Sequence, residues 1–315
     1  MSTARLVPET WELTGDDAWA TLKHCGRRNL LRDAFQRLRF ADGFSHARSL
    51  AFMISLAAIQ GMIALVGFAS ALGNNEFAGV VTRAVHGAAP GPVGELLTAA
   101  IAQAQKEGAT HSFTGLVFGT VGWLITATTA MGQLERGLNR LYGIEKDRAS
   151  VQKYGFALLM AISAGALLTL AVSLLAFGRH FSAAGATSTR ARLWDLATWP
   201  AGLVVTLAAI ALLFRWCPRR RQPAWSWLAF GSSVTVLLWF AATVGLGFYF
   251  SHSAGFGQTY GALAGMVALL MWALLSAIAV FFGAAIAAQL EAVRSAAGSS
   301  PQDEQKVAAS EPDAA

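Results

Sequence analysis

Charged residues are scarce along this chain. Only 13% of its 315 residues are Asp, Glu, Lys or Arg, whereas a soluble domain of this size carries roughly a quarter. Hydrophobic residues make up 55%, and the few charges are gathered between long apolar runs. This composition excludes an ordinary soluble domain and is typical of a protein that crosses a membrane several times.

Residues that build metal sites and nucleophilic sites are also few. The two cysteines, Cys25 and Cys217, are too isolated for a disulfide framework or a four-ligand zinc site. The six histidines are scattered, and none belongs to an HxxxH or HxxE pattern. No glycine-rich phosphate loop follows a strand pattern. The sequence therefore predicts no catalytic site, no metal site and no cofactor.

Ionisable residues are almost absent from the centres of the apolar runs. An intramembrane charge is the usual mark of a proton relay or of a charged substrate held in the membrane, so their absence argues against both. Uncharged polar residues do occur there. The candidates to line a passage are Gln60, Thr126, Thr129, Thr235 and Thr243. The alternative is that these groups bond their own backbone or a neighbouring helix.

The longest apolar run extends from Gln258 to Arg294 and has no charge before Glu291. It is long enough to cross a bilayer with some tilt. Small residues recur along it at helical spacing, interrupted only by Trp272. They are Gly261, Gly265, Ala268, Ser276, Ala279, Gly283 and Ala287. Such a stripe lets another helix approach closely, so this run is expected to be a span with a partner helix.

Six apolar runs predict an all-α fold, a polytopic membrane bundle of six transmembrane helices. The predicted spans cover 49–72, 113–131, 154–177, 196–214, 225–250 and 258–294. Residues 73–112 form a long outer connection. Two amphipathic helices are expected in it, at 75–86 and 93–107, separated by a breaker at 89–92. The chain thus divides into an N-terminal region (1–48), a six-span membrane domain (49–292) and a C-terminal tail (293–315).

Outside the spans, three segments are expected to lack a fixed structure. Residues 1–15, the stretch 178–195 and the tail from Ala296 have the composition of disordered or flexible segments. Residues 26–40 differ, because apolar residues fall on one face of a basic helix. That face carries Leu30, Leu31, Ala34, Phe35 and Leu38. The helix either lies at the headgroups of an anionic leaflet or docks on the ends of the spans.

Positive residues alternate between successive connections. The N-terminal region, residues 132–153, residues 215–224 and the C-terminal tail hold 19 of the 24 lysines and arginines. The positive-inside rule then places both termini in the cytoplasm. Topology accounts for the net charge of +6, so nucleic acid is not an expected partner. The expected partner is the lipid bilayer.

One polar segment near the end of the second span carries the most specific residue pattern in the chain. Its ionisable and amide residues follow one another at helical spacings. They are Glu135, Arg136, Asn139 and Arg140, followed by Tyr142, Gly143 and Arg148. One interpretation is a span that continues past the headgroups, ends at Gly143 and is held by ion pairs. The other is a cytoplasmic gate or a surface for partner docking.

Two stretches carry a resemblance to a known family. The run GLNRLYGIEKDR, ending at Arg148, resembles the "NraYgveE-R" signature of the YihY/BrkB family of bacterial inner-membrane proteins. Residues Tyr260–Glu291 are similar to the family's second signature. The matching positions there include Tyr260, Gly261, Trp272, Ser276, Gly283 and Glu291. The resemblance covers about residues 30–292. The chain departs from the family in its first span, where the family's closing proline is missing, and near Ala285, where the family has a glutamate.

The resemblance implies six spans, cytoplasmic termini and a place in the bacterial plasma (inner) membrane. The family was once labelled ribonuclease BN, and some members are linked to serum resistance or to export of envelope lipids. We therefore expect a protein that moves an amphipathic envelope molecule, a lipid or a lipid precursor. The alternative is a membrane scaffold that recruits partners through its basic loops and transports nothing. Ribonuclease activity is not expected, because RNA hydrolysis needs a metal cluster or an acid/base pair.

Overall fold

All of the regular structure in the described residues is helical. The computed structural model describes residues 4–71, 91–149, 152–167, 170, 189–253 and 263–298. Its helices are α1 (Gly15–Cys25), α2 (Arg27–Phe40), α3 (Gly43–Ala71), α5 (Gly91–Leu141), a helix over residues 152–167, α7 (Thr189–Trp216), α8 (Trp225–His252) and α10 (Ala264–Gly298). No strand occurs in this part of the chain, so the predicted all-α class is confirmed.

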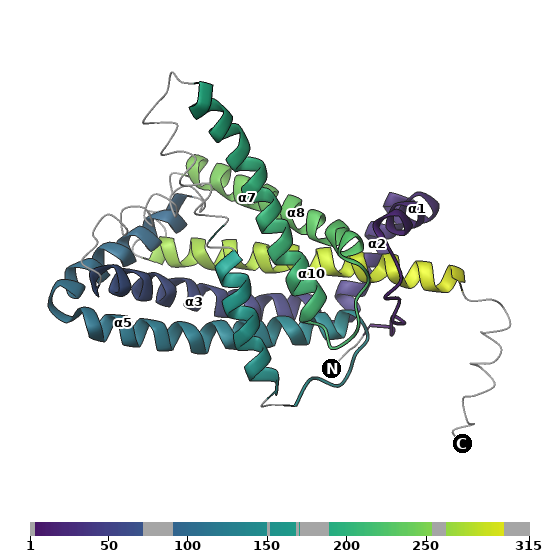
Figure 1. Ribbon diagram of the computed structural model, residues 1–315, viewed down its shortest axis with the longest axis horizontal. Coiled ribbons are helices and arrows are strands. Elements are labelled where there is room, and N and C mark those ends of the chain that lie inside the picture. Colours follow the sequence, from purple (N-terminus) through teal and green to yellow (C-terminus); the bar gives the residue numbers. More distant parts are fainter. Residues whose placement is uncertain are drawn as a thin grey trace.

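Helix α10 is the central element of the bundle (Figure 1). It contacts α1, α2, α3, α5 and α8. Half of its most apolar stretch is buried inside the protein, against 17–22% for the other three long apolar helices. The sequence predicted one partner helix, whereas several elements surround α10. Leu269 and Phe281, which lie largely off the small-residue stripe, are therefore fully buried as well.

Small residues of α10 allow close contact with two different helices, α8 and α5. At Gly283, an added Cβ would clash with the Thr235 hydroxyl and lie 2.6 Å from the carbonyl oxygen of Gly231, both on α8. At Gly265, an added Cβ would lie 2.6 Å from Cβ of Leu96 on α5. The predicted stripe is thus real, but different parts of it touch different helices.

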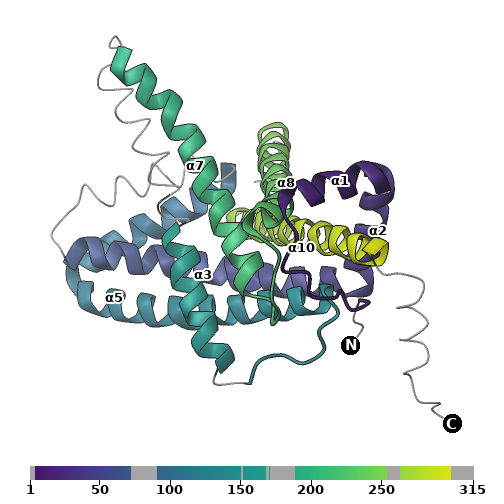
Figure 2. The same ribbon diagram turned by 45° about the vertical axis from the view of Figure 1, so that its right-hand side comes forward.

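Helices α3 and α5 lie side by side in both ribbon views (Figures 1 and 2). A Cβ at Gly67 of α3 would lie 2.7 Å from the backbone nitrogen of Leu116, and one at Gly119 of α5 would lie 2.7 Å from that of Ala64. These glycines bring the two backbones into direct contact. Gly115, in contrast, has open space around it, so it lies away from this contact.

The predicted break between an outer helix and the second span is wrong. The sequence suggested a helix over 93–107 and a separate span from 113, but α5 is one helix of 51 residues. Its start lies within the predicted breaker, at Gly91, which has a φ of 28°. No proline interrupts residues 107–113, and polar residues alone do not end a helix outside the bilayer. The other outer helix, 75–86, lies outside the described residues.

Four helices in the described part of the chain are long and apolar enough to cross a membrane. They are Gly43–Leu65, Gly115–Leu141, Trp225–His252 and Ala264–Ala296. They correspond to the first, second, fifth and sixth predicted spans. The apolar part of α7, Pro200–Trp216, is shorter, and the third predicted span is described only over 152–167 and at residue 170. Since α7 begins at Thr189, the flexible loop expected over 178–195 is wrong for its last residues.

The N-terminal segment is ordered, contrary to the prediction for residues 1–15. Among residues 4–14, the backbone N–H groups of Ala4 and Val7 donate to the carbonyl oxygens of Arg140 and Tyr142, at 3.1 and 3.0 Å. Val7 is buried. These partners lie far away in the sequence, so no local pattern reveals them. Helix α1 then begins after Thr14, whose side chain and backbone form a capping box with Asp17.

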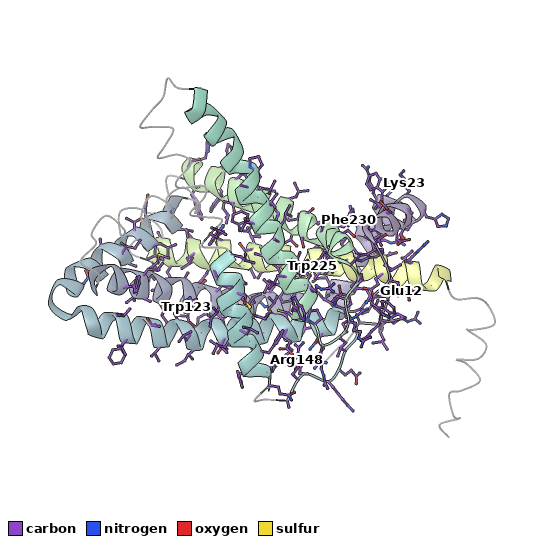
Figure 3. All side chains as sticks on the ribbon, in the orientation of Figure 1. Glu12, Lys23, Trp123, Arg148, Trp225 and Phe230 are labelled. Atoms are coloured by element: carbon purple, nitrogen blue, oxygen red, sulfur yellow. The ribbon has the colours of Figure 1, made fainter. Side chains whose placement is uncertain are left out.

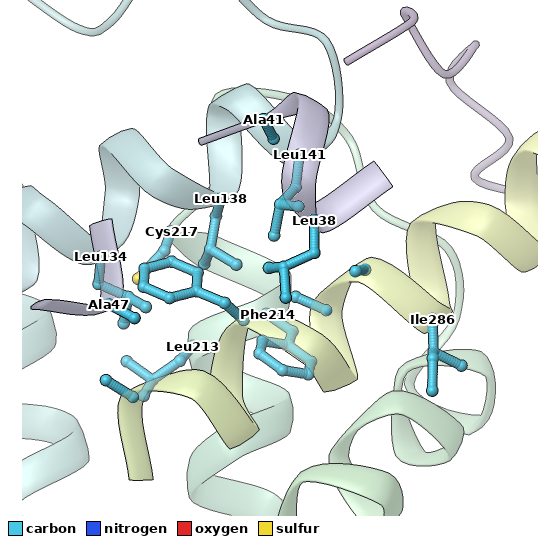
Figure 4. Packing of buried hydrophobic residues seen from close by; sticks show 14 of the residues in the cluster. Leu38, Ala41, Ala47, Leu134, Leu138, Leu141, Leu213, Phe214, Cys217 and Ile286 are labelled. Atoms are coloured by element: carbon cyan, nitrogen blue, oxygen red, sulfur yellow. The ribbon is translucent and has the colours of Figure 1, made fainter. Parts of the chain in front are cut away.

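Helix α2 confirms the predicted amphipathic helix and docks on the ends of the longer helices. Leu30, Ala34 and Leu38 are buried, and Figure 4 shows Leu38 among Leu138, Leu141 and other side chains of the core. Leu31 and Phe35 stay about half exposed. The docked interpretation therefore holds for one edge of the apolar face, and the other edge is open to the surroundings.

Candidate functional site

A buried polar cluster lies at the arginine-rich end of the bundle. It joins the N-terminal segment, the end of α5, the loop 217–224 and the end of α10. We name it the polar cluster and define it by its eight central residues. They are Thr10, Glu135, Asn139, Tyr142, Asp147, Arg148, Arg220 and Glu291. Figure 3 labels Arg148 and Trp225 at this end, away from Trp123 in the other half of the bundle.

Glu291 holds the first half of the polar cluster together. Its side chain is fully buried, and its Oε1 accepts from the Arg220 guanidinium at 2.5 Å and from the Thr10 hydroxyl. The Arg220 guanidinium also lies over the Tyr142 ring, 4.7 Å from its centroid, and donates to the carbonyl oxygen of Pro8 at 2.9 Å. One ion pair thus ties together four segments that are distant in sequence.

Arg37 of α2 extends this half of the cluster. Its guanidinium donates to Gln289 Oε1 at 2.8 Å and to the carbonyl oxygens of Leu141 and Arg5, at 2.9 and 3.1 Å. The carbonyl of Leu141 is one of the last on α5, where backbone acceptors have no partner within the helix. Burial lowers the pKa of Arg37 and is only partly opposed by Tyr142 and Glu291. The arginine therefore fixes α2 to the ends of α5 and α10.

The second half of the cluster is built around Glu135 and Arg148. Their side chains are 3.0 Å apart and mostly buried. Arg148 also donates to the carbonyl oxygen of Cys217 at 2.8 Å and stacks 4.2 Å from the Phe156 ring. Because Arg148 follows the end of α5, this pair folds the chain back and joins it to the loop after α7.

Asn139 links Asp147 to the arginine-rich loop. Its amide donates to Asp147 Oδ1 at 3.0 Å, and its Oδ1 accepts the backbone N–H of Arg219 at 2.8 Å. Asp147 also pairs with Arg136 and Lys153, at 3.4 and 3.5 Å. Burial acts to raise the pKa of Asp147, but the Asn139 hydrogen bond and the nearby cations outweigh it and lower that pKa.

Helix α5 ends in the way that its sequence predicts. Gly143 has a φ of 83°, and its N–H donates to the carbonyl oxygen of Arg140 at 3.2 Å. The next N–H, of Ile144, reaches back to Asn139 at 2.8 Å. These two bonds form a Schellman motif. A Cβ at Gly143 would lie 2.5 Å from the backbone nitrogen of Leu6, so glycine is needed both for its φ and for the approach of the N-terminal segment.

Comparison with known proteins assigns the chain to a family. The pattern of the virulence factor BrkB family matches residues 34–308, which is most of the chain. The chain belongs to the virulence factor BrkB family. The matched region contains all of the polar cluster except Thr10.

Two curated relatives support the assignment to the BrkB family. The chain is 22% identical over 275 residues to a putative ribonuclease-like protein, YfkH, of Bacillus subtilis strain 168, covering 83% of this chain and 95% of the relative. It is 32% identical over 87 residues to a UPF0761 membrane protein of Tolumonas auensis, covering 28% of each chain. No solved structure matches the chain. With its apolar helices, this BrkB family protein is a membrane protein.

The BrkB signature residues fall in several places. Glu135, Asn139, Arg140, Tyr142, Gly143, Arg148 and Glu291 belong to or border the polar cluster, and Arg136 pairs with Asp147 at its edge. Gly283 lies at the contact between α8 and α10. Farther along α10, Ser276 donates to the carbonyl oxygen of Trp272 at 2.7 Å. Tyr260 and Gly261 lie outside the described residues. Whether any of these residues acts in function stays a prediction.

Four of the five candidate passage residues lie at two separate helix contacts. Thr126 of α5 donates to Gln60 Oε1 of α3 at 2.8 Å. Thr235 donates to the carbonyl oxygen of Gly231, and Thr243 accepts from Trp272 Nε1, both where α8 meets α10. Thr129 donates to the carbonyl oxygen of Ile125 on an exposed part of α5. Each polar group thus has a partner on its own helix or on the next, and their role as a passage stays a prediction.

Sequence reasoning missed three members of this site. Thr10 lies in a segment that was expected to be disordered, and Arg37 was not singled out within the predicted basic helix. Arg220 belongs to the arginine-rich loop, which was used only to set topology and as one of the basic loops of the scaffold alternative. A usable signal existed, because the buried end of a span with a lone Glu291 requires a cation. The three adjacent arginines at 219–221 were the candidates to provide that cation.

The two cysteines give a test of this packing. Cys217 is buried, and its burial, with the Glu135 carboxylate nearby, raises the pKa of its thiol to about 12. At pH 8 this thiol is almost wholly protonated and unreactive, whereas Cys25 is only partly buried. We expect a maleimide to label Cys25 in the native protein in detergent, and Cys217 only after denaturation in SDS. Equal labelling of both in the native protein would contradict the packing around Arg148.

Metal binding has no support in the described residues. No group of three or more His, Cys, Asp and Glu side chains among them is placed to hold a metal ion. The two most deeply buried carboxylates, Glu135 and Glu291, are each paired with an arginine. Chemically, the polar cluster is thus suited to holding segments together.

Proposed function

We propose that this BrkB family protein spans the bacterial inner membrane six times, with both termini in the cytoplasm, and transports an amphipathic envelope molecule, a lipid or a lipid precursor. The positive-inside rule supports the orientation, because the polar cluster and the arginine-rich loop lie at the same end. The spans without ionisable residues at their centres suit a substrate that is largely apolar. In this proposal the polar cluster is the cytoplasmic gate, in its closed state.

The observation that carries the gate is the Arg220–Glu291 pair. This pair joins the loop after α7 to α10, while Glu135–Arg148 joins α5 to the same loop. Ion pairs between separate segments can exchange partners without unfolding a helix, as they do in other two-state transitions. A gate of this type would open by separating the loop 217–224 from the end of α10, and the helices would stay intact.

A second candidate function is a membrane scaffold that transports nothing. It is favoured by the partners of the uncharged polar span residues, because Gln60 and Thr126 bond each other and Thr235 bonds its own helix. Such bonds explain these residues by helix packing alone. Under this alternative the polar cluster is a permanent lock, and the basic surface around it recruits partners.

We also propose that the protein is not an enzyme. An acid/base pair needs carboxylates that reach the substrate. Glu135 and Glu291 instead point into the protein, with almost no exposed surface, and each is held by an arginine. The ribonuclease-like name belongs to the Bacillus relative, and the two buried glutamates of the polar cluster offer that chemistry no accessible carboxylate.

Lipid movement across vesicles separates the two candidates. Proteoliposomes with a fluorescent anionic phospholipid in both leaflets are treated with an impermeant quencher, and the slow phase reports movement between leaflets. We expect the wild-type protein to accelerate this phase at least about tenfold over empty vesicles. Glu291→Gln keeps the shape of the side chain but loses its charge. Because it weakens the closed gate, it should raise the rate of lipid movement above that of the wild type. A wild-type rate equal to that of empty vesicles would favour the scaffold.

A further inference from the structure

An open pocket lies beside the polar cluster, where α7 ends and α8 begins. Its volume is about 620 Å³, and its lining combines three tryptophans with three arginines. The arginines are Arg215, Arg220 and Arg221, and the tryptophans are Trp11, Trp216 and Trp225. We propose that this pocket binds the phosphate-bearing headgroup of an anionic lipid.

The charge of the pocket favours an anion. Within the described residues, neither Arg215 nor Arg221 forms an ion pair with a carboxylate. The carboxylate of Glu9 accepts the backbone N–H of Arg221 at 3.2 Å, so it stands near the rim. Glu291 neutralises Arg220 from the buried side only. The lining of the pocket therefore holds three arginines and no carboxylate. Guanidinium suits phosphate oxygens because it presents several donors in one plane.

Arg220 supplies an observation that points to a missing partner. Its side chain is only 3% exposed. Its Nε donates to the carbonyl oxygen of Arg221 and its Nη2 to Glu291 and Pro8. Its Nη1 is buried and has no hydrogen-bond partner among the described residues. A buried guanidinium nitrogen without an acceptor costs free energy, and an anionic oxygen in the pocket would remove that cost.

The pocket lies at the headgroup level of the bilayer. Its walls include the last residue of α7 and the first residue of α8, Trp216 and Trp225, which are 51% and 48% exposed. Tryptophan concentrates at the membrane interface, where its ring meets acyl chains and its N–H meets water. Farther along α8 from Trp225, large apolar side chains such as Leu237 and Phe240 are exposed. A lipid with its phosphate in the pocket would find apolar surface for its acyl chains along α8.

The exposed tryptophans and the apolar face of α8 favour a lipid over a free phosphate ion. A free ion would use the arginines, but it would make no use of the exposed tryptophans or of the apolar face of α8. The inference goes beyond transport, because a bound lipid need not be moved. It would hold for a scaffold as well as for a transporter.

Lipid binding to the purified full-length protein tests the pocket. Native mass spectrometry in detergent would count bound phosphatidylglycerol during a titration, with phosphatidylcholine as the neutral lipid. We expect phosphatidylglycerol to bind at least about tenfold more tightly than phosphatidylcholine. Arg221→Gln should weaken phosphatidylglycerol binding about threefold, and Arg215→Gln with Arg221→Gln about tenfold. Arg221→Lys should keep more of the affinity than Arg221→Gln, because a positive charge remains.

The matched control is Arg28→Gln with Arg32→Gln, which removes two exposed positive charges on α2 at the same end of the bundle. It should leave lipid binding unchanged. An equal loss in this control, or no preference for phosphatidylglycerol in the wild type, would overturn the proposal. Inorganic phosphate and glycerol 3-phosphate serve as soluble competitors. Displacement of phosphatidylglycerol by either one at equal concentration would assign the pocket to a free phosphate and would also overturn the lipid site. Because binding is measured without flux, these results stand apart from the vesicle assay.

Discussion

Replacing Arg220 by alanine is expected to destabilise the protein more than any other single change of charge. The substitution leaves the Glu291 carboxylate fully buried without its cation. Removal of one member of a buried ion pair costs about 3–5 kcal/mol, and Arg220 also loses its contact with the Tyr142 ring. We expect the midpoint of thermal unfolding in detergent to fall by about 10 °C. Scanning fluorimetry of purified protein measures this.

Two variants make the Arg220 result specific. Arg32→Ala removes an arginine whose pair with Asp33 is exposed, and exposed pairs contribute at most about 1 kcal/mol. Arg220→Met with Glu291→Leu removes both charges, and apolar replacement of a buried pair is often neutral. The double variant should therefore unfold at a higher temperature than Arg220→Ala. If Arg220→Ala unfolds no lower than Arg32→Ala, the buried pair does not hold this end of the bundle.

Enlarging Gly283 is the second change with a large expected effect. Even alanine would place its Cβ against the Thr235 hydroxyl and 2.6 Å from the carbonyl oxygen of Gly231. The backbone of α8 cannot yield as a flexible side chain can, so α8 and α10 must move apart. Overpacking of this kind costs about 1–3 kcal/mol. We expect Gly283→Ala to lower the unfolding midpoint by several degrees, and Gly283→Leu to prevent recovery of folded protein from membranes.

Other glycines of the spans provide the matched controls. Gly245 of α8 and Gly115 of α5 have nothing within 4 Å of an added Cβ. Gly245→Ala and Gly115→Ala should unfold at or slightly above the wild-type temperature, because alanine favours a helix over glycine. A Gly283→Ala variant as stable as these two would show that α8 and α10 do not pack as described.

The local sequence pattern was sufficient to predict the positions of the apolar helices. Hydropathy placed α8 within two residues of its observed ends, and the small-residue spacing identified Gly283 as a point of close helix contact. The end of α5 was also predictable, because Gly143 carries the signature of a left-handed helix terminus. These features depend on residues within one or two turns of each other, which is the range that periodicity reports.

Features that depend on distant partners could not be predicted. The residues from Ala4 to Thr10 contain no helix or strand pattern, and their order comes from hydrogen bonds to Arg140, Tyr142 and Glu291. The length of α5 was misjudged for a different reason. Its polar middle part has the composition of a loop, but without proline a helix can continue through it outside the bilayer.

The polar cluster was therefore only half predictable. Glu135 and Asn139 were found because they share a helix with their neighbours at i+3 and i+4 spacing. The loop arginine that neutralises Glu291 was not found, because nothing in the sequence fixes which of three adjacent arginines turns inward. That choice is made by packing, where Arg220 meets the Tyr142 ring and Arg219 lies beside Asp147.

Cross-linking of the N-terminal segment to the arginine-rich loop tests the central claim most directly. The backbone nitrogen of Arg221 lies 3.2 Å from the Glu9 carboxylate, and both residues are exposed. The variant carries Glu9→Cys and Arg221→Cys in a chain with Cys25→Ser and Cys217→Ala, and the two single-cysteine chains are controls. The account predicts that a short impermeant bis-maleimide cross-links the pair in inside-out membrane vesicles and not in right-side-out ones. Cross-linking from the outer face, or none from either face, would contradict a folded polar cluster on the cytoplasmic side.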